Sequence, residues 1–261
     1  MRDSTTVVDF TEVTEAPGTA VTVEALEMLW TRYAFAAEYC AGRDVLELAC
    51  GPGQGLAHLA SVARRLVGGD YTHALLRYAR AEYGDSIPVL RLDAQGIPFR
   101  DASFDTVIMF EAMYYLARPG DFLRECRRVL RPGGRLVLCS VNPEWSDFNP
   151  SPLSHQYWSA NELRVLLAEH GFTADLFAAF DTVARSHRDR VASAVKRVAV
   201  ALGVVPKTMK GKRLLKRLFL GRVTPAPGRV QAGMAAFRAP LRIEDGRARC
   251  FKVLYAVAGR S

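Results

Sequence analysis

A glycine-rich turn is the first feature of this sequence that could do chemistry. Residues 45–55 read VLELACGPGQG, an apolar run with one acid, Glu47, followed by alternate glycines. Glycine permits positive φ and lets a ligand approach bare backbone. A helix after the turn would add free amide hydrogens and the positive end of its dipole. The dinucleotide pattern G-x-G-x-x-G would place its third glycine one position later than this chain does, so the spacing argues against a nicotinamide enzyme.

Two more acids follow the next two apolar runs. Asp70 ends the run LVGGD, and Asp93 ends VLRLD. A carboxylate after the second strand of such a sheet can accept hydrogen bonds from both ribose hydroxyls. A carboxylate after the third can accept from an adenine amine, while a nearby amide donates to the ring. A buried acid such as Glu47 also needs a partner, because burial without one is costly. The three strand ends together predict a nucleoside site.

These side chains meet only if the strands share one edge of a sheet. Short apolar runs alternate with amphipathic stretches, which predicts an α/β fold with a doubly wound, mostly parallel sheet and helices on both faces. In such sheets ligands bind beyond the carboxyl ends of the strands. The expected strands are residues 45–50, 66–70, 89–93, 105–110, 135–141, 172–180 and 249–258. The expected helices are residues 21–41, 54–65, 73–83, 121–130 and 159–170, the last begun by a Ser159–Glu162 capping box.

Five segments in this order carry a family resemblance: VLELACGPGQG (45–55), GGDYTHALLRYAR (68–80), LRLDAQGIPF (90–99), FDTVIMFEAMYYL (104–116) and LRECRRVLRPGGRLVLCSVN (123–142). The set resembles the class I S-adenosylmethionine-dependent methyltransferases, specifically the bacterial branch that acts on small molecules. The resemblance covers about residues 45–180 and the final strand. It implies a seven-stranded Rossmann-like sheet, with S-adenosyl-L-methionine as cofactor and S-adenosyl-L-homocysteine as product.

The resemblance also implies contacts with that cofactor. Glu47 would anchor the methionine ammonium group, directly or through water. Gly51 and Gly53 would let the backbone approach the methionine and ribose, and Asp70 would bind the ribose hydroxyls. The other implied contacts are Tyr71 on the adenine face, Asp93 and Ala94 at the adenine edge, and Phe110 and Glu111 beside the sulfonium. Ala49 belongs to this set but departs from the family, which usually has glycine there.

No motif marks a catalytic base, and one is needed only if the acceptor must lose a proton. His155 is the best candidate because its unperturbed pKa lies near neutrality, and Tyr115 is a second. A proline- and aromatic-rich stretch, residues 142–159, is expected to cover the active face. The candidate pocket residues are Tyr114, Asn142, Trp145, Tyr157 and Trp158. In the alternative interpretation, these aromatics only seal the helix that follows.

Charge divides the chain into regions. The formal net charge is +8, but residues 181–222 hold twelve Lys or Arg and two acids. We expect an N-terminal helical extension (1–42), a cofactor-binding core (43–180), a basic, partly helical insert (181–248) and a final core strand (249–261). Within the insert, residues 183–202 and 206–220 have amphipathic helical patterns. The insert could cap the pocket, meet an anionic substrate or carrier, or touch an anionic membrane. A basic patch alone is weak evidence for nucleic acid.

Other features narrow the class. The N-terminus lacks the basic head and apolar middle of a signal peptide, and no apolar stretch approaches about 20 residues, so a cytoplasmic location is expected. The five cysteines are scattered, which predicts neither a metal site nor disulfides. The expected function is methyl transfer to a small, biosynthetic acceptor. A nucleic-acid or protein methyltransferase and a repurposed cofactor-binding protein are the alternatives. The accepting atom, the acceptor and the oligomeric state stay open.

Overall fold

The structure is a computed structural model that describes residues 9–182, 223–244 and 248–260. Its main sheet has eight strands. In spatial order they are β4 (Val89–Arg91), β3 (Arg65–Asp70), β2 (Asp44–Leu48), β5 (Phe104–Phe110), β6 (Leu130–Val141), β10 (Phe251–Arg260), β7 (Phe172–Asp181) and β9 (Leu241–Arg242). The expected α/β class is therefore confirmed. The expected count of seven strands is one too low, because the short strand β9 adds an edge beside β7.

The direction of the strands follows the expected doubly wound pattern. The chain runs from β2 outward to β3 and β4, then returns to the other side of β2 with β5 and β6, all in parallel pairs. β10 inserts antiparallel between β6 and β7. The direction of winding thus reverses between β2 and β5. That is the switch point at which open α/β sheets bind ligands.

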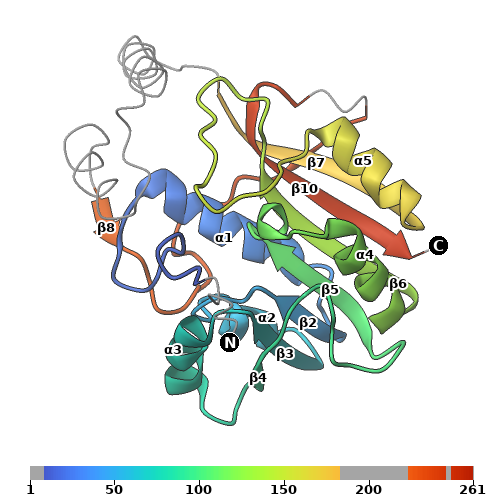
Figure 1. Ribbon diagram of the computed structural model, residues 1–261. Helices are drawn as coiled ribbons and strands as arrows, with labels where there is room; N and C mark the ends of the chain where they lie inside the picture. The colour runs from blue at the N-terminus through green and yellow to red at the C-terminus, as the bar shows by residue number, and fades with distance from the viewer. Residues whose placement is uncertain (1–8, 183–222, 245–247, 261) are drawn as a thin grey trace, which may run out of the picture.

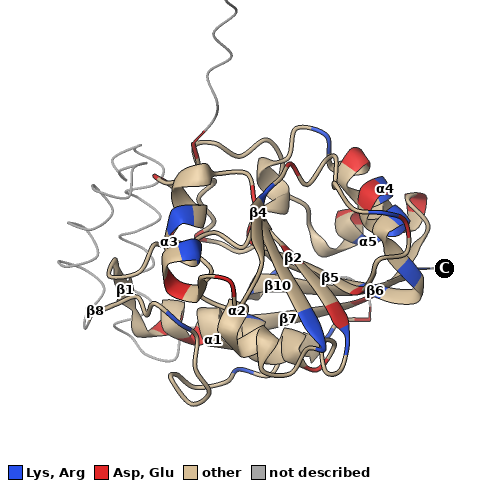
Figure 2. Ribbon diagram, turned by 90° about the horizontal axis from the view of Figure 1, so that it is seen from below, with Lys and Arg blue, Asp and Glu red and all other residues tan. Residues whose placement is uncertain are grey.

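Helices cover both faces of this sheet (Figure 1). On one face α1 (Val23–Ala37), α2 (Leu56–Ala60) and α3 (His73–Tyr83) bury a core that includes Tyr33, Leu56 and Tyr83. On the other, α4 (Pro119–Val129) and α5 (Ala160–Glu169) bury Phe122 and Leu163. Figure 2 shows many of the charged residues on the helices and near the strand ends. Two apolar layers therefore hold the strands and fix where their ends lie.

Most predicted elements are present. The α3 bounds match the prediction, and the capping box of α5 is formed by Ser159 and Glu162. The helix expected over residues 54–65 is wrong in length: α2 spans five residues. It stops because the amides of Arg64 and Arg65 donate to the Arg43 carbonyl, which starts β3 at Arg65. The Pro-Gly-Gly stretch at residues 132–134 lies inside β6, at a register shift against β5.

The N-terminal extension and the described part of the insert form a small two-stranded sheet. β1 (Ala20–Thr22) pairs antiparallel with β8 (Val223–Pro225), and neither strand was predicted. Figure 1 shows the chain before α1 running beside β8. A 3-10 turn, η1 (Met113–Tyr115), follows β5. The two helices expected within residues 183–202 and 206–220 lie outside the described residues. No helix in the described part of the chain is long and apolar enough to cross a membrane.

Candidate functional site

The backbone of the glycine turn bends sharply after β2. Ala49 has φ of +57°, Gly51 +56° and Gly53 +82°. The left-handed conformation costs an alanine about 1 kcal/mol, which explains why glycine is the usual choice at position 49. A side-chain carbon built on Gly51 would meet only Thr14, at 3.7 Å, whereas one on Gly53 would collide with Ala79 at 2.9 Å. Among the described residues only Thr14 therefore lies against Gly51, and Gly53 is required by packing against α3.

Glu47 lies in the middle of the sheet and is 1% exposed. Its Oε1 accepts a hydrogen bond of 2.7 Å from the Tyr33 hydroxyl. Its Oε2 is buried and has no hydrogen-bond partner among the described residues. Burial raises the pKa of Glu47 to about 7, although the Tyr33 hydrogen bond opposes this. An orphaned buried oxygen of this kind fits a cationic ligand group, because an ammonium would supply the missing donor.

Asp70 ends the neighbouring strand β3 and is 6% exposed. Its Oδ2 accepts from the Gly51 amide at 2.8 Å and its Oδ1 from the Thr72 amide at 2.7 Å. Burial raises its pKa, and the two amide hydrogen bonds oppose that effect. The hydrogen bond to Gly51 ties the acid to the glycine turn, and its charge is felt by Glu47. The two acids therefore share one site.

Asp93 follows β4, the next strand of the sheet. Its carboxylate accepts from the amide and the side chain of Gln95 at 2.9 to 3.3 Å. The Leu92 amide donates to the Asp70 carbonyl, which places the ends of these strands side by side. Ala94 is buried beside Asp93. Tyr71 is 37% exposed, as a ring that stacks on a ligand should be. Glu47, Asp70 and Asp93 thus lie on three adjacent parallel strands, around the turn.

Two residues follow β5 on the other side of β2. Phe110 is buried with its ring edge-on to Tyr33, 5.3 Å between centroids. Glu111 has an unusual φ of +50°, and its Oε2 accepts hydrogen bonds of 3.2 Å from the Tyr114 hydroxyl and the Val141 amide. Left-handed backbone at a non-glycine residue concentrates at functional sites. Glu111 is therefore held at the switch point by groups from the 3-10 turn Met113–Tyr115 and from β6.

Aromatic rings gather beyond β5. Tyr114 stacks on Tyr157 at 4.5 Å and is also 4.5 Å from Tyr115. The Tyr115 hydroxyl donates to Ser151 at 2.8 Å, and burial raises the pKa of Tyr115 to about 12. A phenol with that pKa keeps its proton at neutral pH, so Tyr115 is suited to donate a hydrogen bond and unsuited to act as a base. Phe10 packs on this cluster, 5.1 Å from Tyr115.

Other predicted pocket residues lie differently. Asn142 has no exposed surface, and its amide donates to the carbonyls of Ala248 and Phe251 at 2.8 Å. The prediction that Asn142 contacts an acceptor is thus wrong: it holds the start of β10. Trp158 is buried in the core beside α5, which supports the sealing interpretation for this ring. Trp145 lies under the Lys252 ammonium, 5.4 Å from its ring centroid.

His155, the favoured base, is exposed. Its backbone amide donates to the Tyr114 carbonyl at 2.8 Å, which ties the chain, and not the imidazole, to the aromatic cluster. The structure does not bring the imidazole to the buried acids. A catalytic role for His155 therefore stays a prediction without support from the geometry.

Three residues near the site were not predicted, and all precede the glycine turn. They are Tyr33, which bonds Glu47; Arg32, whose charge interacts with Glu111; and Phe10, whose ring lies between Tyr71 (6.3 Å) and Tyr115. A polar Arg-Tyr pair in a helix otherwise rich in apolar residues is the one signal that the sequence offered. No periodicity could show that this helix packs against β2.

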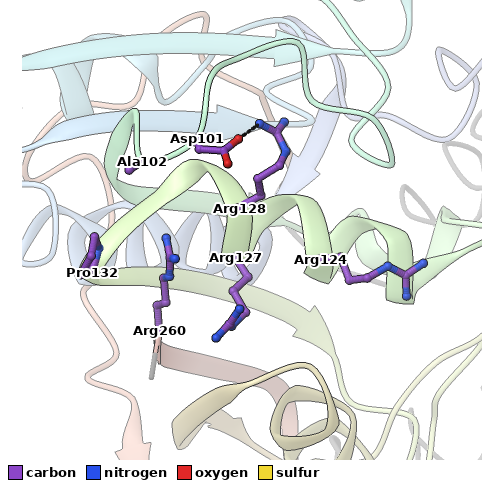
Figure 3. Close-up of a pocket in the computed structure, with 7 residues that line it drawn as sticks. All are labelled: Asp101, Ala102, Arg124, Arg127, Arg128, Pro132 and Arg260. Atoms are coloured by element: carbon purple, nitrogen blue, oxygen red, sulfur yellow. Dashed lines mark hydrogen bonds and ion pairs between the residues drawn. The ribbon is translucent and has the colours of Figure 1, made fainter.

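A surface pocket of about 480 Å³ lies elsewhere (Figure 3). Arg124, Arg127, Arg128 and Arg260 line it with Asp101, which pairs with Arg128 at 2.8 Å. Asp101 precedes β5 and Arg260 ends the antiparallel β10, so the pocket opens at the amino edge of the parallel strands. None of the predicted site residues contributes to it. The pocket is therefore separate from the site at the carboxyl edge.

Comparison with known proteins identifies the central region. Residues 46–138 match the methyltransferase domain family. A probable S-adenosylmethionine-dependent methyltransferase of Mycolicibacterium smegmatis is 37% identical over 162 residues, which cover 58% of this chain and 62% of that protein. One of Mycobacterium tuberculosis strain H37Rv is 34% identical over 158 residues, 56% of this chain and 57% of its own. The chain thus spans less than two thirds of the length of these relatives.

Solved structures agree on the fold. A SAM-dependent methyltransferase from Thermotoga maritima has a TM-score of 0.59 at 14% identity, over 91% of this chain and 92% of its own. The [4+2]-cyclase SpnF has a TM-score of 0.57 at 17% identity, and the match covers 91% of this chain and 81% of SpnF. At such identities the likeness concerns the fold alone. Since one neighbour is described as a cyclase, the fold does not fix the reaction.

Proposed function

We propose that this chain, whose residues 46–138 match the methyltransferase domain family, is a class I S-adenosylmethionine-dependent methyltransferase that transfers a methyl group to a small-molecule acceptor. The family implies S-adenosyl-L-methionine as the cofactor. The residues present fit that group on two counts. Glu47 has a buried oxygen without a hydrogen-bond partner among the described residues, and within the same residues a side-chain carbon on Gly51 would meet only Thr14, at 3.7 Å.

The observation that carries the proposal is the placement of three acids on adjacent strand ends. Glu47 would hold the methionine ammonium, Asp70 the ribose hydroxyls, and Asp93 with Ala94 the adenine edge. Both oxygens of Asp70 already accept one amide each, and a carboxylate oxygen can accept a second hydrogen bond. Tyr71 would cover the adenine face. Phe110 and Glu111, at the switch point, would border the methionine end.

The bound cofactor would supply an already activated methyl group on sulfur. The task of the protein is then to orient the acceptor and exclude water, and orientation alone lowers barriers by about 7–11 kcal/mol in favourable cases. The aromatic cluster of Tyr114, Tyr115 and Tyr157 is the apolar surface next to the switch point. Because Tyr115 keeps its proton, we propose that it orients the acceptor and does not deprotonate it.

Relatives' names support a small acceptor. They include a demethylmenaquinone methyltransferase of Clavibacter sepedonicus, 35% identical over 104 residues, and an O-methyltransferase of Penicillium expansum, 30% identical over 148 residues. The first name indicates a small organic acceptor, and the second indicates only that the methyl group goes to an oxygen. An anionic substrate or carrier at the basic insert remains part of the proposal, on the charge of residues 181–222.

Two measurements test the proposal. Calorimetric titration should give tight binding of S-adenosylhomocysteine and none of NAD. Incubation with methyl-labelled S-adenosylmethionine and a metabolite extract should then give a labelled small product. Label found only on nucleic acid or protein would overturn the acceptor class. Binding without any transfer would favour a repurposed cofactor-binding protein.

A further inference from the structure

Tyr33 reaches the cofactor site from outside the methyltransferase domain match. It lies on α1, before residue 46, and is 6% exposed. Its hydroxyl donates to Glu47 Oε1 at 2.7 Å, a buried hydrogen bond to the acid that faces the proposed ammonium. Burial, together with the nearby Glu47, raises the pKa of Tyr33 well above its usual value. The phenol therefore stays protonated and donates its hydrogen bond to the carboxylate oxygen.

The glycine turn makes room for this ring. A side-chain carbon on Gly55 would lie 1.8 Å from Tyr33 Cε1 and 2.0 Å from its Cζ. Position 55 must therefore be glycine to make room for the Tyr33 ring, whereas a side-chain carbon on Gly51 would meet only Thr14 among the described residues. The edge of Phe110 meets the Tyr33 ring from another side. Fixed between helix, turn and strand, the hydroxyl has one position available.

Because the Tyr33 hydroxyl donates to Oε1, Oε2 is the oxygen of Glu47 that can bind a ligand group. The Tyr33 hydroxyl occupies one oxygen of the carboxylate, so the other, Oε2, remains without a hydrogen-bond partner among the described residues. We infer that Tyr33 is a positioning residue for the cofactor: it orients Glu47 and stabilises its charged form, so that Oε2 receives the ammonium group of the methionine moiety. This inference rests on the proposed function.

Several other groups lie near Glu47. Arg32 on α1 and Asp70 on β3 influence its ionisation, whereas burial together with Glu47 itself raises the pKa of Cys40, Cys50 and Tyr83. Of these, Arg32 favours the carboxylate and Asp70 opposes it. The Tyr33 hydrogen bond acts in the same direction as Arg32. Because the pKa of Glu47 is about 7, removal of the hydroxyl should leave Glu47 largely protonated at neutral pH.

The test is the affinity for S-adenosylhomocysteine of the full chain and of Tyr33→Phe, at pH 7 and pH 9. A hydrogen bond to a charged group is worth about a tenfold change in ionisation or more. We expect Tyr33→Phe to bind roughly five- to fiftyfold more weakly at pH 7 and no more than about twofold more weakly at pH 9. The affinity of Tyr33→Phe recovers at pH 9 because Glu47 ionises there even without the hydrogen bond from Tyr33.

Tyr83→Phe is the matched control. Its hydroxyl donates to the Gly53 carbonyl at 2.7 Å, so it supports the same turn without bonding Glu47. Any loss of affinity in this variant should be equal at both pH values. Thermal unfolding shows whether each variant folds, and the carboxyl NMR titration of Glu47 gives a readout without ligand, with a higher pKa expected in Tyr33→Phe.

The outcomes separate the two proposals. If the natural chain does not bind S-adenosylhomocysteine at either pH, the proposed function fails. If it binds and Tyr33→Phe shows the same affinity ratio at pH 7 and pH 9, the role of Tyr33 is overturned and the function stands. An unchanged titration of Glu47 in Tyr33→Phe overturns it as well.

Discussion

Replacing Glu47 with glutamine should separate binding from stability. Glutamine keeps the shape of the side chain, and its oxygen can still accept from Tyr33. It removes the charge of a carboxylate that is 1% exposed and whose Oε2 has no hydrogen-bond partner among the described residues. An acid whose pKa is higher in the folded state binds more protons there than in the unfolded chain. Stability must then fall as the pH rises between the two pKa values.

The magnitude follows from the pKa. Glu47 has a folded pKa of about 7 against an ordinary value of 4.5. A pKa difference of 1 between the folded and unfolded states corresponds to about 1.36 kcal/mol. Ionisation of the buried side chain at high pH therefore lowers the free energy of unfolding by about 3 kcal/mol. Because of this group, the free energy of unfolding of the natural chain should fall by about 2.5 kcal/mol between pH 5 and pH 8.5. Glu47→Gln has no carboxyl group to ionise at this position, so its free energy of unfolding lacks this decrease. The new amide adds only an offset that is the same at both pH values.

The assay is urea unfolding of both chains at pH 5 and pH 8.5. The difference in the free energy of unfolding should shift by about 2.5 kcal/mol in favour of Glu47→Gln at the higher pH. Saturating S-adenosylhomocysteine should reverse the order, because only the carboxylate gains from the ammonium. If the free energies of unfolding of the two chains change in parallel with pH in the absence of ligand, the reasoning is refuted, because ionisation of Glu47 then does not destabilise the fold.

Three further predictions concern packing and chemistry. Gly55→Ala should lower the free energy of unfolding by about 1–3 kcal/mol, because its new carbon meets the Tyr33 ring; urea unfolding should show the cost largely relieved in Tyr33→Leu/Gly55→Ala, and additive effects would contradict this contact. Asn142→Ala should lower the free energy of unfolding by about 2–4 kcal/mol, because the buried carbonyls of Ala248 and Phe251 lose their donor. The KM for the acceptor should stay unchanged in the folded protein. A raised KM would show that Asn142 contacts the acceptor after all. Tyr115→Phe should retain kcat within about tenfold at pH 7, and a far larger loss would reinstate it as a proton-transfer group.

Residues before the matched domain contribute much of the site's surroundings. Phe10 lies between Tyr71 and Tyr115, and Thr14 is the nearest atom group to Gly51. Tyr33 and Arg32 approach two acids from α1. A domain cut at residue 46 would lose all four. Experiments on cofactor binding therefore need the full chain.

Sequence patterns determined the order of elements because each pattern is local. Apolar runs of five to seven residues and the helical spacing of Leu75, Leu76 and Ala79 reflect burial on a strand or on one helix face. The two-residue strand β9 and the β1–β8 pair carry no such pattern. Their pairing depends on which segments the folded chain brings together, and no local spacing encodes that.

The same division holds for the site. Glycines and acids placed directly after apolar runs indicated Glu47, Gly51, Asp70 and Asp93, because parallel strands present their carboxyl ends at one edge. Tertiary structure alone decided that Gly55 makes room for Tyr33, that Asn142 is sealed in the core, and that one oxygen of Glu47 lacks a partner. Each of these depends on contacts between residues distant in the chain. A sequence lists the groups that can meet, and packing determines which of them do.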